Sequence, residues 1–238
     1  MDAYKASIGT QRFMLWLAIG MTAVFAVAWM GLMGFFPPPP ANLPPDKVAE
    51  LYALHNLRFR IGVILGLMAG GFLVPLSIVI SVQMARVEKG FPLWAILQGI
   101  TGTIGSMFIW FPVLLWGVAA FTPERPTEIT ALVHEFAWLT YITELSLFPM
   151  QLLGIAVICF TKDEDDKVSA FPRWLGYLTV WQAIQSFGGP IAMLFKQGIF
   201  AWNGLLPFWL PFSLFFAWYG AICLTILRAL RQQQTANG

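Results

Sequence analysis

Long apolar runs, separated by short polar connections, dominate the sequence. Each run is bounded by charged residues or proline, and six are present: 13–36, 61–82, 93–121, 132–160, 174–195 and 205–227. Because a helix rises about 1.5 Å per residue, each run can cross a hydrocarbon core of about 30 Å. The pattern predicts an all-α, polytopic bundle of six transmembrane helices, forming a single transmembrane domain over residues 1–238.

The longest polar interruption, residues 37–59, is predicted to lie on the outer side. Four consecutive prolines at 37–40 favour an extended, polyproline-like start. After Asp46, apolar or aromatic positions recur at helical spacing: Val48, Leu51, Tyr52 and His55. We expect a short amphipathic helix on the outer membrane surface that leads into the second spanning helix.

Composition supports lipid as the main solvent of the chain. Hydrophobic residues make up 58% and charged residues only 11%, whereas soluble domains carry roughly 25% charged residues. The net charge is +2, and the basic residues lie at segment ends rather than in one patch. Nucleic-acid binding therefore has no support, and the expected partner is the lipid bilayer.

The distribution of Lys and Arg predicts the orientation. On the side that carries both termini lie Lys5, Arg12, Arg86, Lys89, Lys162, Lys167, Arg173, Arg228 and Arg231. The other side has Lys47, Arg58, Arg60, Arg125 and Lys196. Since basic residues collect in cytoplasmic loops, we expect both termini in the cytoplasm and the protein in a bacterial inner membrane.

The second to fifth helices contain a candidate parallel repeat. Leu-Val-Pro-Leu at 73–76 and Phe-Pro-Leu-Trp at 91–94 match Leu-Phe-Pro-Met at 147–150 and Phe-Pro-Arg-Trp at 171–174. Superposing Pro75 on Pro149 places Gly70 opposite Glu144, and it likewise places Arg60 opposite His134. The alternative interpretation is that Phe-Pro-x-Trp is simply a good interfacial helix start.

Glu144 is the most informative residue of the fourth helix. It lies about 18 Å from the outer end of its run, near mid-membrane, where a carboxylate costs about 2.5–3.5 kcal/mol unless it faces protein or water. Pro149 also removes the backbone bond to Leu145, which leaves a carbonyl free beside Glu144. Helical spacing predicts one polar stripe through His134, Ala137, Tyr141, Glu144, Phe148 and Gln151. The stripe is either a proton or cation relay and ligand anchor, or interhelical hydrogen bonding that stabilises the bundle.

The fifth helix offers a facing polar surface. Its candidate residues are Thr179, Gln182, Gln185 and Ser186. Gly188-Gly189-Pro190 follows and should kink or break the helix, a feature that recurs at transporter substrate sites. A plain proline kink is the alternative.

Charged residues near the outer surface form a candidate gate. We expect Arg60 to close an outer vestibule with Glu128 or Glu135, and Lys196 to join it. Arg58 and Arg60 could equally extend toward phosphate headgroups. Most of the 11 Trp and 21 Phe, including Trp16, Trp94, Trp174 and Trp202, are expected in interface belts or facing lipid.

Several functional classes are excluded. Two histidines are too few for a membrane di-iron enzyme, and the last helix has no lysine for rhodopsin chemistry. No P-loop is present. No metal or cofactor is predicted.

Two segments carry a family resemblance: Phe-Pro-Arg-Trp-Leu-Gly-Tyr at 171–177 and Phe-Ala-Trp-Asn-Gly at 200–204. Together with the proline-rich outer loop they resemble an uncharacterised group of six-helix bacterial inner-membrane proteins, and the likeness covers most of the chain. The group is associated with bacteria that degrade hydrophobic compounds. The resemblance implies no established activity and no functional residues.

The leading functional hypothesis is binding or transport of a small, mostly apolar molecule, with proton coupling through Glu144. One alternative is an accessory subunit of a homo- or hetero-oligomeric membrane complex. A second is an enzyme acting on a lipid-like substrate, with Glu144 and His134 as acid–base groups.

Overall fold

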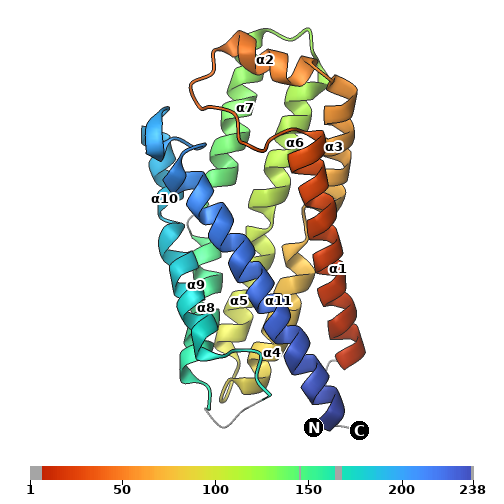
Figure 1. The fold of residues 1–238 in the computed structure, drawn as a ribbon, viewed down its shortest axis with the longest axis vertical. Coiled ribbons are helices and arrows are strands. Elements are labelled where there is room, and N and C mark those ends of the chain that lie inside the picture. Colours follow the sequence, from red (N-terminus) through yellow and green to blue (C-terminus); the bar gives the residue numbers. More distant parts are fainter. Residues whose placement is uncertain (1–6, 145, 164–167, 237–238) are drawn as a thin grey trace.

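The computed structural model describes residues 7–144, 146–163 and 168–236 as an elongated helical bundle without strands (Figure 1). In this described part, five segments are long and apolar enough to cross a membrane: Ile8–Leu32, Asn56–Val87, Leu93–Phe121, Thr127–Thr161 and Gly198–Ala236. Lys5, Leu145 and Lys167, used in the predictions above, lie outside the described residues.

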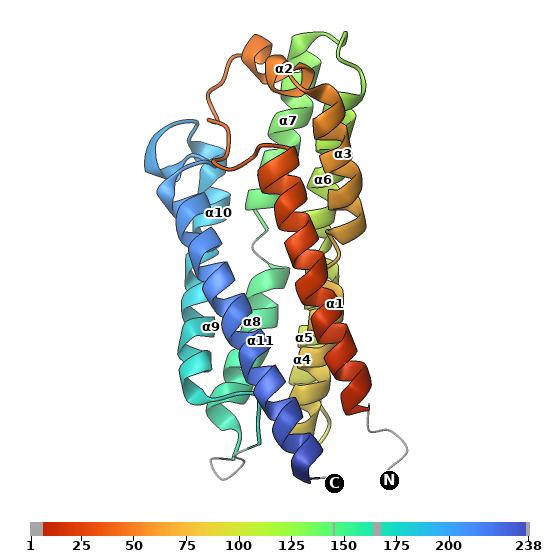
Figure 2. The same ribbon diagram turned by 45° about the vertical axis from the view of Figure 1, so that its right-hand side comes forward.

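The predicted fifth run, 174–195, is not among these five segments. It folds as α9 (Arg173–Gln185), α10 (Gly188–Ile191) and the 3-10 helix η2 (Ala192–Leu194). These elements follow one another along the bundle beside α8 and α11 (Figures 1 and 2). An interruption at Ser186 and Phe187 lies directly before the Gly-Gly-Pro triplet that was expected to break the helix.

The first and last helices each contain a π-helical segment. The first consists of α1 (Ile8–Ala26) and η1 (Val27–Leu32), and the last of η4 (Leu205–Trp209) and α11 (Leu210–Ala236). At the start of α1, Ser7 Oγ accepts the backbone N–H of Thr10 at 3.0 Å. The start of α1 and the end of α11 lie at the same end of the bundle (Figure 2).

The remaining helices are interrupted near the middle of the bundle (Figure 1). The paired elements are α3 (Asn56–Ala69) with α4 (Leu73–Val87), α5 (Leu93–Gly105) with α6 (Met107–Phe121), and α7 (Thr127–Ile142) with α8 (Leu147–Thr161). Pro75 and Pro149 are the third residues of α4 and α8, where a missing N–H costs nothing at a helix start. Backbone hydrogen bonds continue into the turns at these interruptions, as from Gly70 N–H to the carbonyl of Gly66 and from Ser106 N–H to that of Gly102.

Glycines let these interruptions pack against each other. A Cβ at Gly189 would overlap the carbonyl oxygen of Ile142, the last residue of α7, and a Cβ at Gly188 would lie 2.7 Å from the carbonyl oxygen of Leu206 in η4. Only residues without a Cβ allow this approach. The start of α10 is thereby held between the end of α7 and η4.

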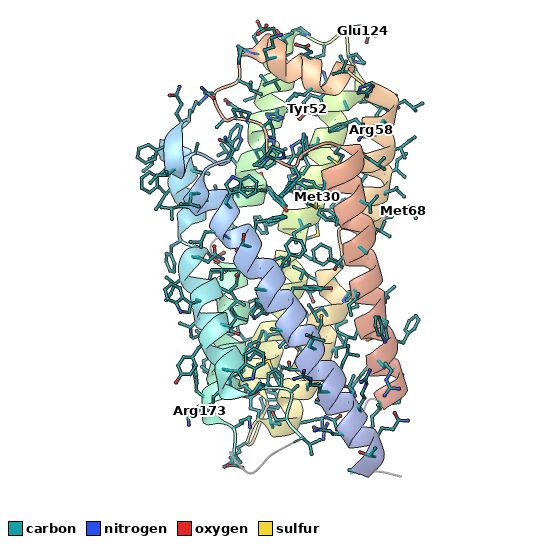
Figure 3. All side chains as sticks on the ribbon, viewed as in Figure 1. Met30, Tyr52, Arg58, Met68, Glu124 and Arg173 are labelled. Carbon is teal, nitrogen blue, oxygen red and sulfur yellow. The ribbon has the colours of Figure 1, made fainter. Side chains whose placement is uncertain are left out.

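The segment 37–59 contains the expected short helix, α2 (Pro45–Ala53), and part of its apolar face packs on the bundle. Val48 and Tyr52 are buried against the end of the bundle, whereas Leu51 and His55 are exposed. Figure 3 shows Tyr52 beneath α2, which crosses the ends of α6 and α7. Burial of Tyr52 requires a hydrogen-bond partner for its hydroxyl, and His134 supplies one.

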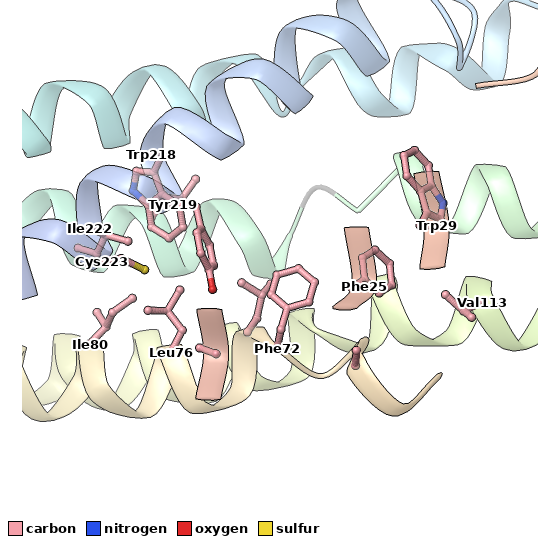
Figure 4. Close-up of a cluster of buried hydrophobic side chains, with 14 of the residues drawn as sticks. Phe25, Trp29, Phe72, Leu76, Ile80, Val113, Trp218, Tyr219, Ile222 and Cys223 are labelled. Atoms are coloured by element: carbon pink, nitrogen blue, oxygen red, sulfur yellow. The ribbon is translucent and has the colours of Figure 1, made fainter. Parts of the chain in front are cut away.

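Aromatic side chains fill much of the core. Trp29, Trp116, Trp138 and Trp218 are at most 2% exposed. Figure 4 shows the ring of Phe72, from the turn between α3 and α4, between those of Phe25 in α1 and Tyr219 in α11. The ring centroids of Phe25 and Phe72 are 5.5 Å apart, which is typical of an aromatic pair.

Candidate functional site

A cavity of about 190 Å³ lies at the level of the helix interruptions. Residues on both sides of the interruptions contribute to its wall, among them Leu73, Gly105, Ile142 and Gly189. Phe216 of α11 also lines it and is 40% exposed, so the cavity reaches the edge of the bundle. Its volume is below the roughly 300–1,000 Å³ of sites for drug-sized ligands and suits a smaller molecule.

Most of the cavity wall is aromatic. The rings come from α1, η1, η4, α11 and the helix interruptions: Phe25, Trp29, Phe72, Phe108, Phe148, Phe208, Phe212, Phe215 and Phe216. Trp29 stacks on Phe208, with ring centroids 6.1 Å apart, and on Phe212 at 6.4 Å. These π faces provide an apolar surface that also attracts cations.

Five of the seven predicted relay and ligand residues line this cavity. They are Tyr141, Glu144, Gln182, Gln185 and Ser186. They come from the end of α7, the α7–α8 interruption and the end of α9. The predicted facing of the fourth and fifth helices thus brings polar groups of both to the same cavity.

Glu144 lies in the interruption between α7 and α8, not on a continuous helix. Its Oε1 accepts the backbone N–H of Leu147 at 2.5 Å, and its Oε2 accepts that of Phe148 at 2.9 Å. The first N–H groups of a helix lack intrahelical partners and carry partial positive charge. The start of α8 therefore stabilises the carboxylate.

The continuous polar stripe predicted for the fourth helix does not form. The helix ends at Ile142, so His134 and Gln151 lie on separate helices. The physical reason is local: Pro149 cannot supply the N–H that would continue the helix through this point, and Glu144 caps the new start.

Gln182 and Gln185 are buried amides with unused acceptors. Gln182 is 2% exposed and Gln185 is 7% exposed, yet neither Oε1 has a hydrogen-bond partner. Gln185 Nε2 donates to the backbone carbonyl of Gln182 at 2.9 Å, and Ser186 Oγ donates to the same carbonyl at 3.0 Å. These hydrogen bonds orient the side chains of Gln185 and Ser186, but they leave the amide oxygens of Gln182 and Gln185 without a donor.

His134 is buried away from the cavity lining. Its Nδ1 lies 2.6 Å from the hydroxyl of Tyr52, while its Nε2 has no partner. Burial raises the pKa of Tyr52 well above 10, so the phenol stays protonated at neutral pH. His134 therefore connects α7 to α2 at the end of the bundle opposite the start of α1, and it does not line the cavity that Glu144 lines.

Gln151 also lies outside the cavity lining. It is 1% exposed, and its Oε1 accepts a long hydrogen bond from Ser77 Oγ at 3.4 Å. A Cβ at Gly102 would overlap this amide oxygen. Gln151 therefore connects α8 to α4 and α5.

The outer charged residues do not form the gate that was expected around Arg60. Glu135 pairs with Lys196 at 2.7 Å, whereas the Arg60 guanidinium lies 5.4 Å from the ring centre of Phe121. Arg58 donates to the carbonyl oxygen of Gly31, and Glu128 is exposed in the first turn of α7. An aromatic face and a backbone carbonyl satisfy the two arginines without a carboxylate.

The aromatic wall was missed at the sequence level. Trp202 was expected in an interface belt, but it is 4% exposed and its Nε1 donates to the carbonyl of Pro39 at 2.9 Å. Trp16 and Trp174 are more than half exposed. A signal for the wall was present in the last helix, where Phe208, Phe212 and Phe215 recur at helical spacing.

Comparison of the chain with protein families, curated proteins and solved structures finds no match. The resemblance to an uncharacterised six-helix group therefore stays a prediction.

Proposed function

We propose that this protein is a bacterial inner-membrane protein that binds or transports a small, mostly apolar molecule. The supporting observation is the aromatic cavity at the helix interruptions, with Glu144, Gln182 and Gln185 in its lining. Cavities of this kind, lined by apolar groups and a few convergent polar groups, are typical ligand sites. Interrupted helices around such a cavity are a recurrent arrangement in transporters.

The proposal includes six membrane crossings, with both termini in the cytoplasm. The sixth crossing would be α9, α10 and η2, which run beside the long helices. Arg12, Arg86 and Arg173 belong to the end of the bundle where α1 begins and α11 ends, as the positive-inside rule expects.

The parallel repeat is part of the same proposal. α4 and α8 each have 15 residues with proline at the third position. α5 and α9 each have 13 residues, each directly preceded by a proline. Under this repeat Gly70 corresponds to Glu144, so the carboxylate is present on one side of the cavity only.

The direct test uses three probes of matched shape: 2-phenylethylammonium, 2-phenylethanol and propylbenzene. Binding to the full chain in lipid nanodiscs is measured by equilibrium dialysis, with empty nanodiscs as the blank. We expect saturable binding of at least one probe. Ala26→Trp should abolish it, because Ala26 lines the cavity and the indole would fill it.

Ala23→Trp is the matched control. Ala23 lies on the same helix but is exposed and does not line the cavity, so binding should be unchanged. If every probe only partitions into lipid without saturation, or if Ala26→Trp binds as well as Ala23→Trp, the proposed function is wrong.

Proton coupling through Glu144 has its own test. If ligand binding changes the protonation of this carboxylate, affinity will vary between pH 5 and pH 8, and the variation will vanish in Glu144→Gln. Tyr141 is the other titratable group among the described lining residues, and Tyr141→Phe should keep the pH dependence. An unchanged pH profile in Glu144→Gln would contradict coupling.

The enzyme hypothesis gains no support from these contacts. Its two acid–base groups do not meet, since His134 is bonded to Tyr52 and lies outside the described cavity lining.

A further inference from the structure

Two of the polar residues that line the cavity carry acceptors that no protein group satisfies. Gln182 Oε1 and Gln185 Oε1 are buried without partners. The hydroxyl of Ser186 and the Nε2 of Gln185 are already donated to the carbonyl of Gln182. A buried acceptor without a partner is destabilising, so a ligand that brings donors to these oxygens would recover that free energy.

Glu144 adds negative charge to the same cavity lining. Each of its two oxygens accepts a different backbone N–H, which is the pattern of an ionised carboxylate. The partial charge at the start of α8 amounts to only about half an elementary charge. Among the described residues that line the cavity, none is Lys, Arg or His, so part of the negative charge has no cationic partner there.

The aromatic residues of the lining favour the same kind of ligand. Trp29, Phe208 and Phe212 form a cluster in which each ring stacks on the other two, with centroids 5.3 to 6.4 Å apart. Aromatic faces attract a cation in addition to covering apolar surface. Unused acceptors, residual negative charge and ring faces therefore surround one small volume.

Resting on the function proposed above, we propose that the ligand is an organic monocation, a compact apolar body that carries a primary ammonium group. Its N–H groups would donate to Gln182 Oε1, Gln185 Oε1 and the Glu144 carboxylate, and its apolar body would lie against Trp29 and the phenylalanines. A neutral alcohol could satisfy one acceptor at a time, and a hydrocarbon could satisfy none.

The three matched probes test this assignment, because they differ only in the terminal group: ammonium, hydroxyl or methyl. We expect 2-phenylethylammonium to bind at least about tenfold tighter than 2-phenylethanol, and propylbenzene to bind weakest, because hydrogen bonds from a charged donor are about twice as strong as neutral ones. Glu144→Gln should reduce the preference for ammonium over alcohol to within about threefold.

A second pair of variants keeps the test decisive if Glu144→Gln fails to fold. Gln182→Met and Gln185→Met remove the amide oxygens at similar side-chain length. Each should weaken ammonium binding about tenfold and leave propylbenzene binding unchanged or tighter. Gln233→Met is the control, since Gln233 is a buried glutamine that does not line the cavity. Size-exclusion chromatography and circular dichroism establish the folded fraction of each variant.

The outcomes separate the two proposals. If 2-phenylethanol binds as tightly as the ammonium probe, or if the ammonium preference survives Glu144→Gln, the monocation assignment is wrong while the proposed function stands. If none of the three probes shows saturable binding, the proposed function fails as well.

Discussion

Two groups of buried glutamines in this protein have the same chemistry but opposite hydrogen bonding. Near the ends of α1 and α11, Gln83 Nε2 donates to Gln11 Oε1 at 2.7 Å, and Gln233 Nε2 donates to Gln83 Oε1 at 2.9 Å. At the cavity, Gln182 and Gln185 are equally buried, yet both amide oxygens lack a partner.

The difference teaches how to separate structural from functional polar groups in a membrane bundle. Buried amides that satisfy one another hold helices together, here α1, α4 and α11. Buried amides that remain unsatisfied beside a cavity reduce stability unless a ligand supplies the missing donors. Glu144 also lines the cavity, as the unsatisfied amides do, but its carboxylate is stabilised by the start of α8.

The largest expected effect comes from disrupting the backbone packing of α10, the element that follows Gln182 and Gln185 in the chain. Gly189→Ala should lower the unfolding free energy by about 3 kcal/mol or more, because the new methyl group overlaps the backbone carbonyl of Ile142. The measurement is unfolding in mixed micelles with increasing dodecyl sulfate, followed by circular dichroism. Gly220→Ala is the control: a Cβ there meets no atom within 4 Å, and alanine should stabilise α11 by up to about 1 kcal/mol.

The next largest effect is expected from the glutamines that are hydrogen-bonded to one another, Gln11, Gln83 and Gln233. Gln83→Leu should cost about 1–2 kcal/mol, because Gln233 then loses its acceptor inside the bundle and Gln11 loses its bond to Gln83. The same unfolding titration measures it. Probe binding at the cavity should be unchanged, and a stability equal to wild type would show that these bonds add nothing.

His134 is an intermediate case, with one nitrogen bonded and one without a partner. Tyr52→Phe removes the bonded contact and should cost about 1 kcal/mol. Tyr177→Phe, at an exposed tyrosine, should change stability by less than about 0.5 kcal/mol. Equal effects of the two substitutions would argue against a structural role for the Tyr52–His134 bond.

The pH dependence of the same pair has a defined sign. Burial raises the pKa of Tyr52 well above 10, so its proton is lost first from the unfolded chain as the pH rises. The contribution of Tyr52 to stability is complete below about pH 10 and decreases above it, by up to about 1.4 kcal/mol per pH unit. Unfolding titrations at pH 9 and pH 11 should therefore show a smaller loss in Tyr52→Phe than in the wild type.

The smallest effect on stability is expected at Gln182, one of the two cavity glutamines whose amide oxygen has no partner. Gln182→Leu removes an amide whose Oε1 has no partner, so stability should change by less than about 0.5 kcal/mol or increase. A loss as large as that of Gln83→Leu would mean that Gln182 is structurally satisfied. The comparison between the two regions would then be wrong.

Much of the helical architecture was predictable. The predicted run at 93–121 corresponds to Leu93–Phe121, and the run at 132–160 lies within Thr127–Thr161. The interruption at Glu144 was not predicted, because Pro149 alone is compatible with either a kinked or a broken helix. A break also needs a carboxylate to cap α8 and the close approach of Gly189 to Ile142.

The candidate site was predicted in part. Glu144, Gln182, Gln185 and Ser186 were singled out from their polarity and their position in a run, which are both local properties, and all four line the cavity. Placing His134 on the same stripe failed because the stripe assumed an unbroken helix. Pairing Arg60 with Glu135 failed because Lys196 is the partner of Glu135.

The sequence alone predicted long apolar helices, because its apolar runs are long enough to cross a bilayer. It also identified the polar residues inside those runs, where burial without a partner is energetically unfavourable. Hydropathy is a property of a single apolar run, so it can be evaluated without knowing which helices that run packs against. Whether a buried amide stabilises the bundle or faces a ligand depends on atoms from distant segments. Gln83 and Gln233 are hydrogen-bonded although 150 positions separate them in the sequence, whereas Gln182 lines an aromatic cavity. Hydrogen bonds are short and directional, so that distinction arises only when the helices pack.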